Sequence, residues 1–190
     1  MEMRQIVCLT GLVALLTCVA SADIVNGSFE TGDFTGWRTD DIGGFCQVVA
    51  GGTHGQWMAR LTLEGRYLPD DGGYRFAPAS TMLYQYPVDI PADAMYLLFD
   101  AWVEGDSYAI ASFTEDHLVE VTAAYPTQYA IDLTGIRGLS LELDFLGRDT
   151  DVGENYAYLD NVRFTDVPEP GTFGLCLTGI LALWTVCRKR

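Results

Sequence analysis

The sequence predicts an all-β domain folded as a β-sandwich. Between residues 139 and 145, leucine or phenylalanine alternates with polar residues, which is the two-residue period of a strand with one buried face. Other short apolar segments are separated by clusters of glycine, proline and aspartate, which are typical of turns. Residues 23–166 contain no helical periodicity of useful length. Many short strands joined by turns favour two packed sheets over one open sheet.

The expected strands follow one another between these turn clusters. Residues 95–103 are the most apolar segment, and we expect a deeply buried strand in which alternate residues from Leu97 to Val103 share a face. Turn clusters at 40–44 and 69–73 separate neighbouring segments. In chain order, we expect strands at 24–30, 46–50, 56–63, 82–88, 95–103, 107–114, 118–123, 128–132, 139–145 and 157–164.

The N-terminal segment, residues 1–22, is predicted to be the helix of a signal peptide. Arg4 precedes an apolar stretch at 6–19, and Ala20-Ser-Ala22 has the small residues expected before a cleavage site. The stretch is too short to span a bilayer comfortably, so a removed signal fits better than an anchor. We therefore expect the mature chain to begin near Asp23.

The cysteines allow one alternative at this end of the chain. Cys18 would be lipidated in a lipoprotein, but Thr17 is bulkier than the residue usually found before such a cysteine. Cys46 is the only cysteine between residues 23 and 166, so no disulfide can form within the domain. A buried thiol is the expected state of Cys46.

The C-terminal segment, residues 167–190, has three parts in a fixed order. A Pro-Glu-Pro turn bars helix formation before an apolar run at 171–187, which is just long enough for a transmembrane helix. The basic residues after the run would stay on the cytoplasmic side, leaving the preceding domain outside. The residues of the turn and the basic cluster are Pro168, Glu169, Pro170, Arg188, Lys189 and Arg190.

This arrangement resembles the PEP-CTERM sorting signal of Gram-negative bacterial surface proteins. The resemblance implies that an exosortase, which is a membrane cysteine protease, recognises the tail. It also implies that residues 23–166 are exported across the inner membrane to the cell surface or extracellular matrix, with the chain anchored transiently or permanently. An ordinary C-terminal anchor with an incidental Pro-Glu-Pro sequence is the alternative.

The charge of the chain excludes some classes of partner. The net charge is −15, and the only lysine is Lys189. Nucleic acid would be repelled, because its binding depends on basic side chains that neutralise phosphates. Such a surface suits a hydrated matrix or divalent cations. A zinc site is not expected, because His54 and His117 stand far apart without ligand spacing.

The body of the chain also resembles a known family. The segments Asn26-Gly-Ser-Phe-Glu30, Gly36-Trp37, Thr53–Leu61 and Tyr158–Phe164 look like motifs of carbohydrate-binding modules with a galactose-binding-like jelly roll. They occur in the expected order across nearly the whole domain. The resemblance implies a two-sheet jelly roll and, in many members, glycan binding together with a structural calcium ion.

Three residues are implied as calcium ligands. The family positions that match Asp160 and Glu30 supply carboxylates, and the carbonyl of Ser28 would add a backbone oxygen. Strand parity places Asp160 on the same face as Val162, which should be buried, so its charge needs a metal or a partner. The alternative is that Asp160 pairs with Arg60 and no ion binds.

A second acidic segment, residues 149–154, begins with the Asp-x-Asp-x-Gly pattern of a calcium loop. It lacks the third acidic position and the distal glutamate of an EF-hand, so a solvated acidic loop is the better interpretation.

Glycan binding requires aromatic faces with planar polar groups beside them. The segment 64–76, which we expect to be a loop, offers Tyr67, Tyr74, Arg66 and Arg75 as ligand-binding residues. Aromatic residues on the expected strands could instead line a concave face, although such residues more often pack in the core. They are Trp57, Tyr84, Tyr86, Trp102 and Tyr108.

The sequence predicts a protein that is not an enzyme, because no catalytic serine or cysteine motif lies near either histidine. Our leading hypothesis is an exported surface protein whose domain binds extracellular polysaccharide. A structural matrix protein that binds calcium without glycan is the second hypothesis. A glycan hydrolase is the third, since twenty-six acidic residues guarantee some neighbouring carboxylates.

Overall fold

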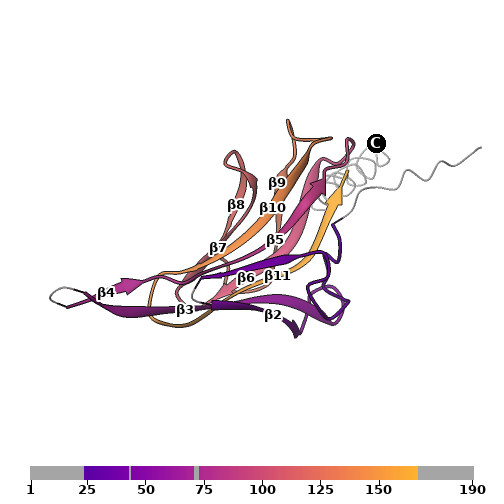
Figure 1. The fold of residues 1–190 in the computed structure, drawn as a ribbon. Helices are drawn as coiled ribbons and strands as arrows, with labels where there is room; N and C mark the ends of the chain where they lie inside the picture. The colour runs from indigo at the N-terminus through magenta and orange to yellow at the C-terminus, as the bar shows by residue number, and fades with distance from the viewer. Residues whose placement is uncertain (1–23, 43, 71–72, 167–190) are drawn as a thin grey trace, which may run out of the picture.

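The computed structural model describes residues 24–42, 44–70 and 73–166, which form two layers of β-sheet (Figure 1). The expected signal peptide, sorting motif and transmembrane helix, at 1–22 and 167–190, lie outside the described residues. Within the described ranges, no helix is long and apolar enough to cross a membrane. The all-β class predicted from the sequence is confirmed.

The strands pair in two antiparallel sheets. The first sheet has the order β1-β5-β10-β7-β8, and the second has the order β2-β3-β11-β6-β9, with β4 added to β3. The strands of the first sheet are β1 (Arg38–Ile42), β5 (Ser80–Asp89), β7 (Ser107–Thr114), β8 (His117–Val121) and β10 (Ser140–Asp149). Those of the second are β2 (Gly44–Ala50), β3 (Trp57–Asp70), β4 (Gly73–Ala77), β6 (Tyr96–Glu104), β9 (Thr127–Asp132) and β11 (Gly153–Thr165).

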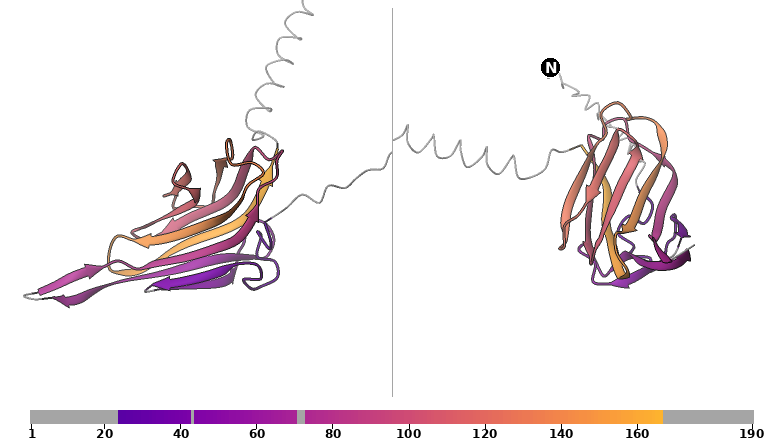
Figure 2. Two further views of the ribbon diagram at one scale, coloured as in Figure 1. Left: turned by 45° about the horizontal axis from the view of Figure 1, so that its top comes forward. Right: turned by 90° about the vertical axis from the view of Figure 1, so that its left-hand side faces the viewer.

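One hairpin extends past the rest of the sandwich. The outer half of β3 pairs only with β4, and the two strands project together from one end of the molecule (Figures 1 and 2). Residues 64–76 were expected to be a loop, and that expectation is wrong. A two-stranded ribbon forms because Tyr67 pairs with Phe76 in register and their rings pack edge to face at 6.0 Å between centroids.

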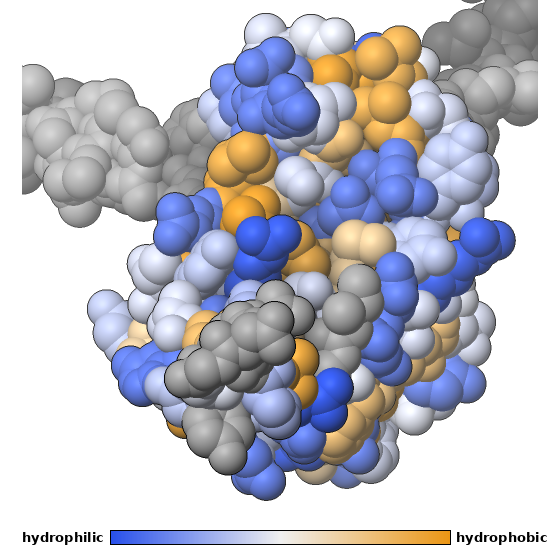
Figure 3. Space-filling model, turned by 60° about the vertical axis from the view of Figure 1, so that its left-hand side comes forward, coloured by the Kyte–Doolittle hydropathy of each residue, from blue (hydrophilic) through white to orange (hydrophobic). Residues whose placement is uncertain are grey.

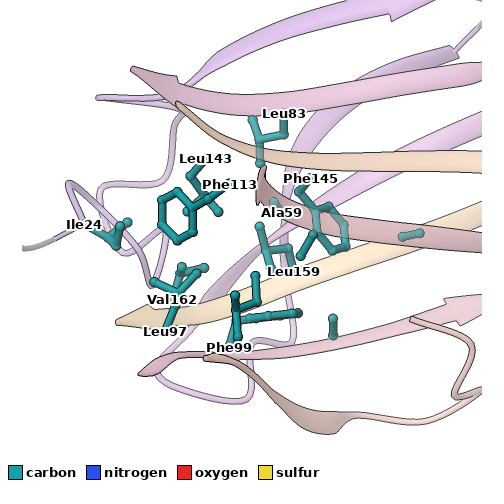
Figure 4. Packing of buried hydrophobic residues seen from close by; sticks show 14 of the residues in the cluster. Ile24, Ala59, Leu83, Leu97, Phe99, Phe113, Leu143, Phe145, Leu159 and Val162 are labelled. Atoms are coloured by element: carbon teal, nitrogen blue, oxygen red, sulfur yellow. The ribbon is translucent and has the colours of Figure 1, made fainter. Parts of the chain in front are cut away.

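The core lies between the two sheets, where alternate side chains of facing strands meet (Figure 4). Leu83, Phe113 and Phe145 enter it from the first sheet, and Phe99 and Leu159 enter it from the second. Each such side chain contributes about 1.5–3 kcal/mol when fully buried. The described residues enclose this core among themselves.

Most of the expected strands are present. The strand expected at 107–114 is β7 with the same bounds, and the alternation at 139–145 is confirmed in β10 by buried Leu143 and Phe145 beside exposed Glu142. The first and fourth strands were not expected. Residues 40–42 of β1 and 69–70 of β3 are strand, although both lie in segments read as turn clusters.

The strand expected at 24–30 is wrong. Asn26 and Phe29 have φ angles of 50° and 55°, so the segment forms turns rather than extended chain. The turns dock on β11: the amide of Val162 donates to the Gly27 carbonyl at 2.8 Å, and a Cβ at Gly27 would lie 2.1 Å from the Val162 oxygen. Phe29 is thereby fully buried, with Trp37 beside it.

Cys46 is a free thiol on β2 that packs against the core. Its Sγ lies 3.9 Å from the carbonyl oxygen of Met82 on the other sheet. Burial, together with the charge of Asp41, raises the pKa of this thiol far above its usual range.

Candidate functional site

The outer face of the first sheet carries tyrosines among charged side chains. Tyr84 and Tyr86 project from β5, and Tyr86 is 56% exposed. Glu142 and Asp144 project from β10 beside them, because the alternate residues Leu143 and Phe145 point into the core. We call this surface the tyrosine face, and define it by Arg38, Tyr84, Tyr86, Tyr108, Glu142, Asp144 and Arg148.

One row of this face runs across all five strands. In register, Arg38 lies opposite Tyr84, Tyr84 opposite Asp144, Asp144 opposite Ser112, and Ser112 opposite Leu118. The row therefore sets a guanidinium, an aromatic ring, a carboxyl group and a hydroxyl side by side. These are the groups that orient a polar ligand over an aromatic surface.

Asp144 is the most unusual group of the tyrosine face. Its Oδ1 atom is buried and has no hydrogen-bond partner among the described residues. Loss of solvent, followed by the charge of Glu142 and a hydrogen bond with it, raises the pKa of Asp144 to about 6. A buried oxygen without a hydrogen-bond donor destabilises the folded protein. A ligand hydroxyl that donates to this oxygen would remove that penalty.

The aromatic residues on strands separate into two groups. Tyr84, Tyr86 and Tyr108 lie on the tyrosine face. Trp102 instead stacks on Tyr158 at 4.6 Å between ring centroids, on the outer side of the second sheet, and both rings are almost fully buried. Trp57 packs against the core.

The expected calcium ligands meet at a different place, around the segment 52–57. The Oε1 atom of Glu30 accepts hydrogen bonds from the amides of Gln56 and Trp57, each at 2.8 Å. The Oδ2 atom of Asp160 accepts one from the amide of His54 at 2.9 Å. Ser28 lies in the same turn as Glu30. The structure thus brings both carboxylates to one segment.

The face assigned to Asp160 from strand parity is wrong. Leu159 and Val162 both point into the core, which is possible only because a β-bulge between Asp160 and Arg163 adds a residue, with Asn161 at a φ angle of 56°. Asp160 therefore lies on the outer side of β11, opposite Asp100 of β6. It is nevertheless fully enclosed.

Arg60 is not the partner of Asp160. Its Nη2 donates to Gln47, and its guanidinium lies 5.1 Å from the ring centroid of Tyr156. The partners of Asp160 are instead the amides of His54 and Asn161 and the Thr53 hydroxyl.

Two carboxylates of this acidic site share a single hydroxyl donor. The Thr53 hydroxyl lies 2.6 Å from Oδ2 of Asp100 and 3.1 Å from Oδ2 of Asp160, yet it can donate to only one of them. Burial raises the pKa of Asp160, against the hydrogen bonds that it accepts. A hard cation would relieve this concentration of oxygen and charge, so the donor types fit calcium. No cluster of three or more His, Cys, Asp or Glu side chains is gathered as a metal site among the described residues.

The hairpin distributes its candidate ligand residues over two faces. Tyr67 is 57% exposed and packs on Phe76, whereas the neighbouring Arg66 points to the other side of β3. Tyr74 and Arg75 lie on β4 opposite Pro69 and Leu68. The structure does not gather Tyr67 and Arg66 into one site.

The acidic segment 149–154 is only partly the solvated loop that was expected. Asp149 is 3% exposed, and its Oδ1 accepts the amide of Ala79 at 2.7 Å. Burial raises the pKa of Asp149. Asp151 and Glu154, in contrast, are exposed.

Two solved structures of carbohydrate-binding modules have a fold similar to that of this chain. The complex of TmCBM61 with β-1,4-galactotriose has a TM-score of 0.52 and 18% identity, over 74% of this chain and 94% of that one. A structure described for the promiscuous specificity of modules of the β-sandwich superfamily has a TM-score of 0.51 and 15% identity, over 73% and 60% of the two chains. No protein-family model matches the chain, and no curated protein does. These likenesses establish the β-sandwich fold.

Sequence reasoning missed Asp144, Asp100 and Thr53. Asp144 stands in the polar phase of the alternating strand, where a solvated side chain is the usual expectation. Its neighbour Tyr84 lies sixty residues away and becomes visible only once the strands are paired.

Asp144→Asn should stabilise the protein above pH 6. Because the folded-state pKa of Asp144 is raised to about 6, the folded protein holds a proton that the unfolded chain loses near pH 4. The free energy of unfolding of the parent therefore falls as pH rises from about 4 to about 6. The variant has no carboxyl group to titrate at this position, so its free energy of unfolding should fall less over the same range. We expect a gain of about 1 kcal/mol at pH 7, or about 2–4 °C in Tm, after allowance for solvent screening.

Thermal melts at several pH values, with the exposed Asp116→Asn as the control for net charge, measure this effect. An equal gain in both variants would show that Asp144 has no special environment.

Proposed function

We propose that residues 23–166 form a glycan-binding module that is not an enzyme, with a galactose-binding-like jelly-roll fold. The unpaired Oδ1 of Asp144 carries this proposal, since this acceptor lacks a donor among the described residues and Asp144 lies opposite Tyr84 in register. A sugar offers hydroxyl donors on its edge and an apolar C–H surface on its face. Tyr84 and Tyr86 would stack on that face while Asp144 accepts a hydroxyl.

A further observation supports a glycan ligand. The solved structure of TmCBM61 holds a galactotriose, so one protein with this fold binds a neutral oligosaccharide. The hairpin residues proposed from the sequence, Tyr67, Tyr74, Arg66 and Arg75, would add contacts beyond the tyrosine face.

The module would be displayed outside the cell. Residues 1–22 would direct export, and residues 167–190 would act as a PEP-CTERM sorting signal, held in the inner membrane and recognised by an exosortase-type protease. The partner would then be an extracellular polysaccharide. Absence of lysine from residues 23–166 and a net charge of −15 suit a hydrated matrix.

We also propose a structural calcium ion held by Glu30, Asp160 and the Ser28 carbonyl. The ion would tie the N-terminal turn to β11, as a disulfide does in other exported domains. The shared hydroxyl of Thr53, which serves two carboxylates with one proton, supports a cation near Asp160. A matrix protein that binds calcium without glycan would have this calcium site but no glycan site on the tyrosine face.

Tyr84→Ala should weaken glycan binding at least tenfold, or by about 1.4 kcal/mol, because it removes the ring beside Asp144. Calorimetry with neutral galactan, glucan, mannan and xylan fragments measures the loss. Tyr125→Ala removes a more exposed ring from a loop outside the tyrosine face and should leave the affinity unchanged. If the folded domain binds none of these glycans, glycan binding is rejected and the calcium-binding matrix protein becomes the better proposal.

Calcium should raise the Tm of the domain relative to a chelator. An excess of a hundredfold over Kd contributes about 2.7 kcal/mol, or about 5–10 °C. Glu30→Gln keeps an oxygen for the amides of Gln56 and Trp57 but loses the charge, so its response should be much smaller. The exposed Glu120→Gln should respond like the parent. A parent Tm that calcium does not move would reject the ion.

A reporter fused after Asp166 should be active only outside the inner membrane. The expected topology puts residues 23–166 outside and Arg188 at the cytoplasmic end of the helix. Activity in the cytosol would reject export and, with it, the sorting assignment. Mass spectrometry of the mature C-terminus then distinguishes a cleaved tail from a retained anchor.

A further inference from the structure

A hollow of about 510 Å³ lies on the second sheet, at the base of the projecting hairpin. Its walls come from the start of β2, the middle of β3 and the start of β11. It is separate from the tyrosine face, which belongs to the first sheet. We call it the hairpin hollow, and its lining residues are Gly44, Phe45, Glu64, Gly65, Arg66, Val152, Gly153 and Glu154.

The lining combines an aromatic surface with groups that bind hydroxyls. Phe45 is 39% exposed and Val152 is 43% exposed, although both are apolar. Figure 3 shows apolar and polar residues interspersed at the end of the molecule from which the hairpin projects. Glu64 and Glu154 lie directly opposite each other in register, and Arg66 lines the same hollow. Two acceptors and one fork of donors therefore line the hollow together with the aromatic ring.

The paired glutamates are costly without a ligand. Like charges directly opposite on neighbouring strands destabilise a sheet. The Tyr156 hydroxyl already donates to Oε2 of Glu154 at 2.7 Å. Sugar hydroxyls that donate to Glu64 and to the other oxygen of Glu154 would offset part of the remaining repulsion, as would the neighbouring guanidinium of Arg66. The paired carboxylates therefore lower the stability of the fold, and a ligand rich in hydrogen-bond donors would reduce this loss.

The floor of the hollow is bare backbone for a structural reason. A Cβ at Gly65 would lie 2.2 Å from Oδ2 of Asp149 and 2.8 Å from the Phe76 ring. Asp149 is almost fully buried below the floor, and this Oδ2 has no hydrogen-bond partner among the described residues. Glycine is therefore required at this position, because Asp149 approaches the backbone of β3 from beneath the hollow.

We propose that the hairpin hollow is a second glycan-binding site that takes a neutral sugar unit. This inference rests on the proposed function, because it assumes that the module binds polysaccharide. Phe45 stacks on the sugar ring, Glu64 and Glu154 accept its hydroxyls, and Arg66 donates to a ring or hydroxyl oxygen. Uronic acid or sulfated units are disfavoured, since two carboxylates face one guanidinium on a chain with a net charge of −15.

Two sites on opposite outer faces give the module a distinct action. The tyrosine face and the hairpin hollow belong to different sheets, whose inner faces enclose the core. One domain then holds two polysaccharide chains and joins them, or binds one long chain twice with increased avidity. A module with one site would only attach to the matrix.

Calorimetric stoichiometry on residues 23–166 tests this inference with the same neutral fragments. We expect two oligosaccharides per parent domain and one per Phe45→Ala domain, with at least a tenfold loss at the altered site. Tyr84→Ala should also bind one, and the double variant should bind none. Tyr125→Ala, with an exposed ring outside both sites, should still bind two. Each variant is compared with the parent in Tm, so that loss of fold is recognised.

The outcomes separate the two proposals. A single oligosaccharide per parent domain, or an unchanged stoichiometry in Phe45→Ala, overturns the second site while glycan binding stands. No binding of any fragment by the folded parent overturns both. Equal stoichiometry and affinity for hyaluronate fragments would overturn the assignment to neutral sugars.

Discussion

The enclosed carboxylate of Asp160 is the interaction on which the arrangement of the second sheet depends. It lies at the bulge of β11 and accepts hydrogen bonds from residues that precede β3. The bulge also directs the Val162 amide to the carbonyl of Gly27, which holds the N-terminal turn. Each amide deprived of its acceptor in a buried site costs about 1–3 kcal/mol. Loss of Asp160 would therefore loosen the first turn and the loop before β3 together.

The two sheets share one core but present different outer surfaces. On the first sheet, the central strands β5 and β10 hold a half-buried carboxyl group among tyrosines. On the second sheet, Trp102 and Tyr158 cover each other, so the middle of that face is closed and its open surface is at the base of the hairpin. Four buried side-chain atoms of the described residues lack hydrogen-bond partners, at Arg60, Thr62, Asp144 and Asp149. Asp144 belongs to the first of these surfaces, and Asp149 lies beneath the second.

Sequence patterns predicted the fold wherever side chains alternate. The strand at 139–145 was recognisable because its apolar phase fills the core. The polar strand β1 has no such phase, and it forms because its backbone pairs with β5. The bulge at Asn161 reversed the parity of Asp160, which no local pattern encodes. Asp144 escaped notice because the main cause of its raised pKa is loss of solvent, which depends on the packing of neighbouring strands and not on local sequence.

The thiol on β2 has a consequence for contacts between copies of the domain. Oxidation to a disulfide proceeds through the thiolate, and burial beside Asp41 keeps Cys46 protonated at neutral pH. Two copies that meet along this edge strand would therefore not become covalently joined, and their association would stay reversible.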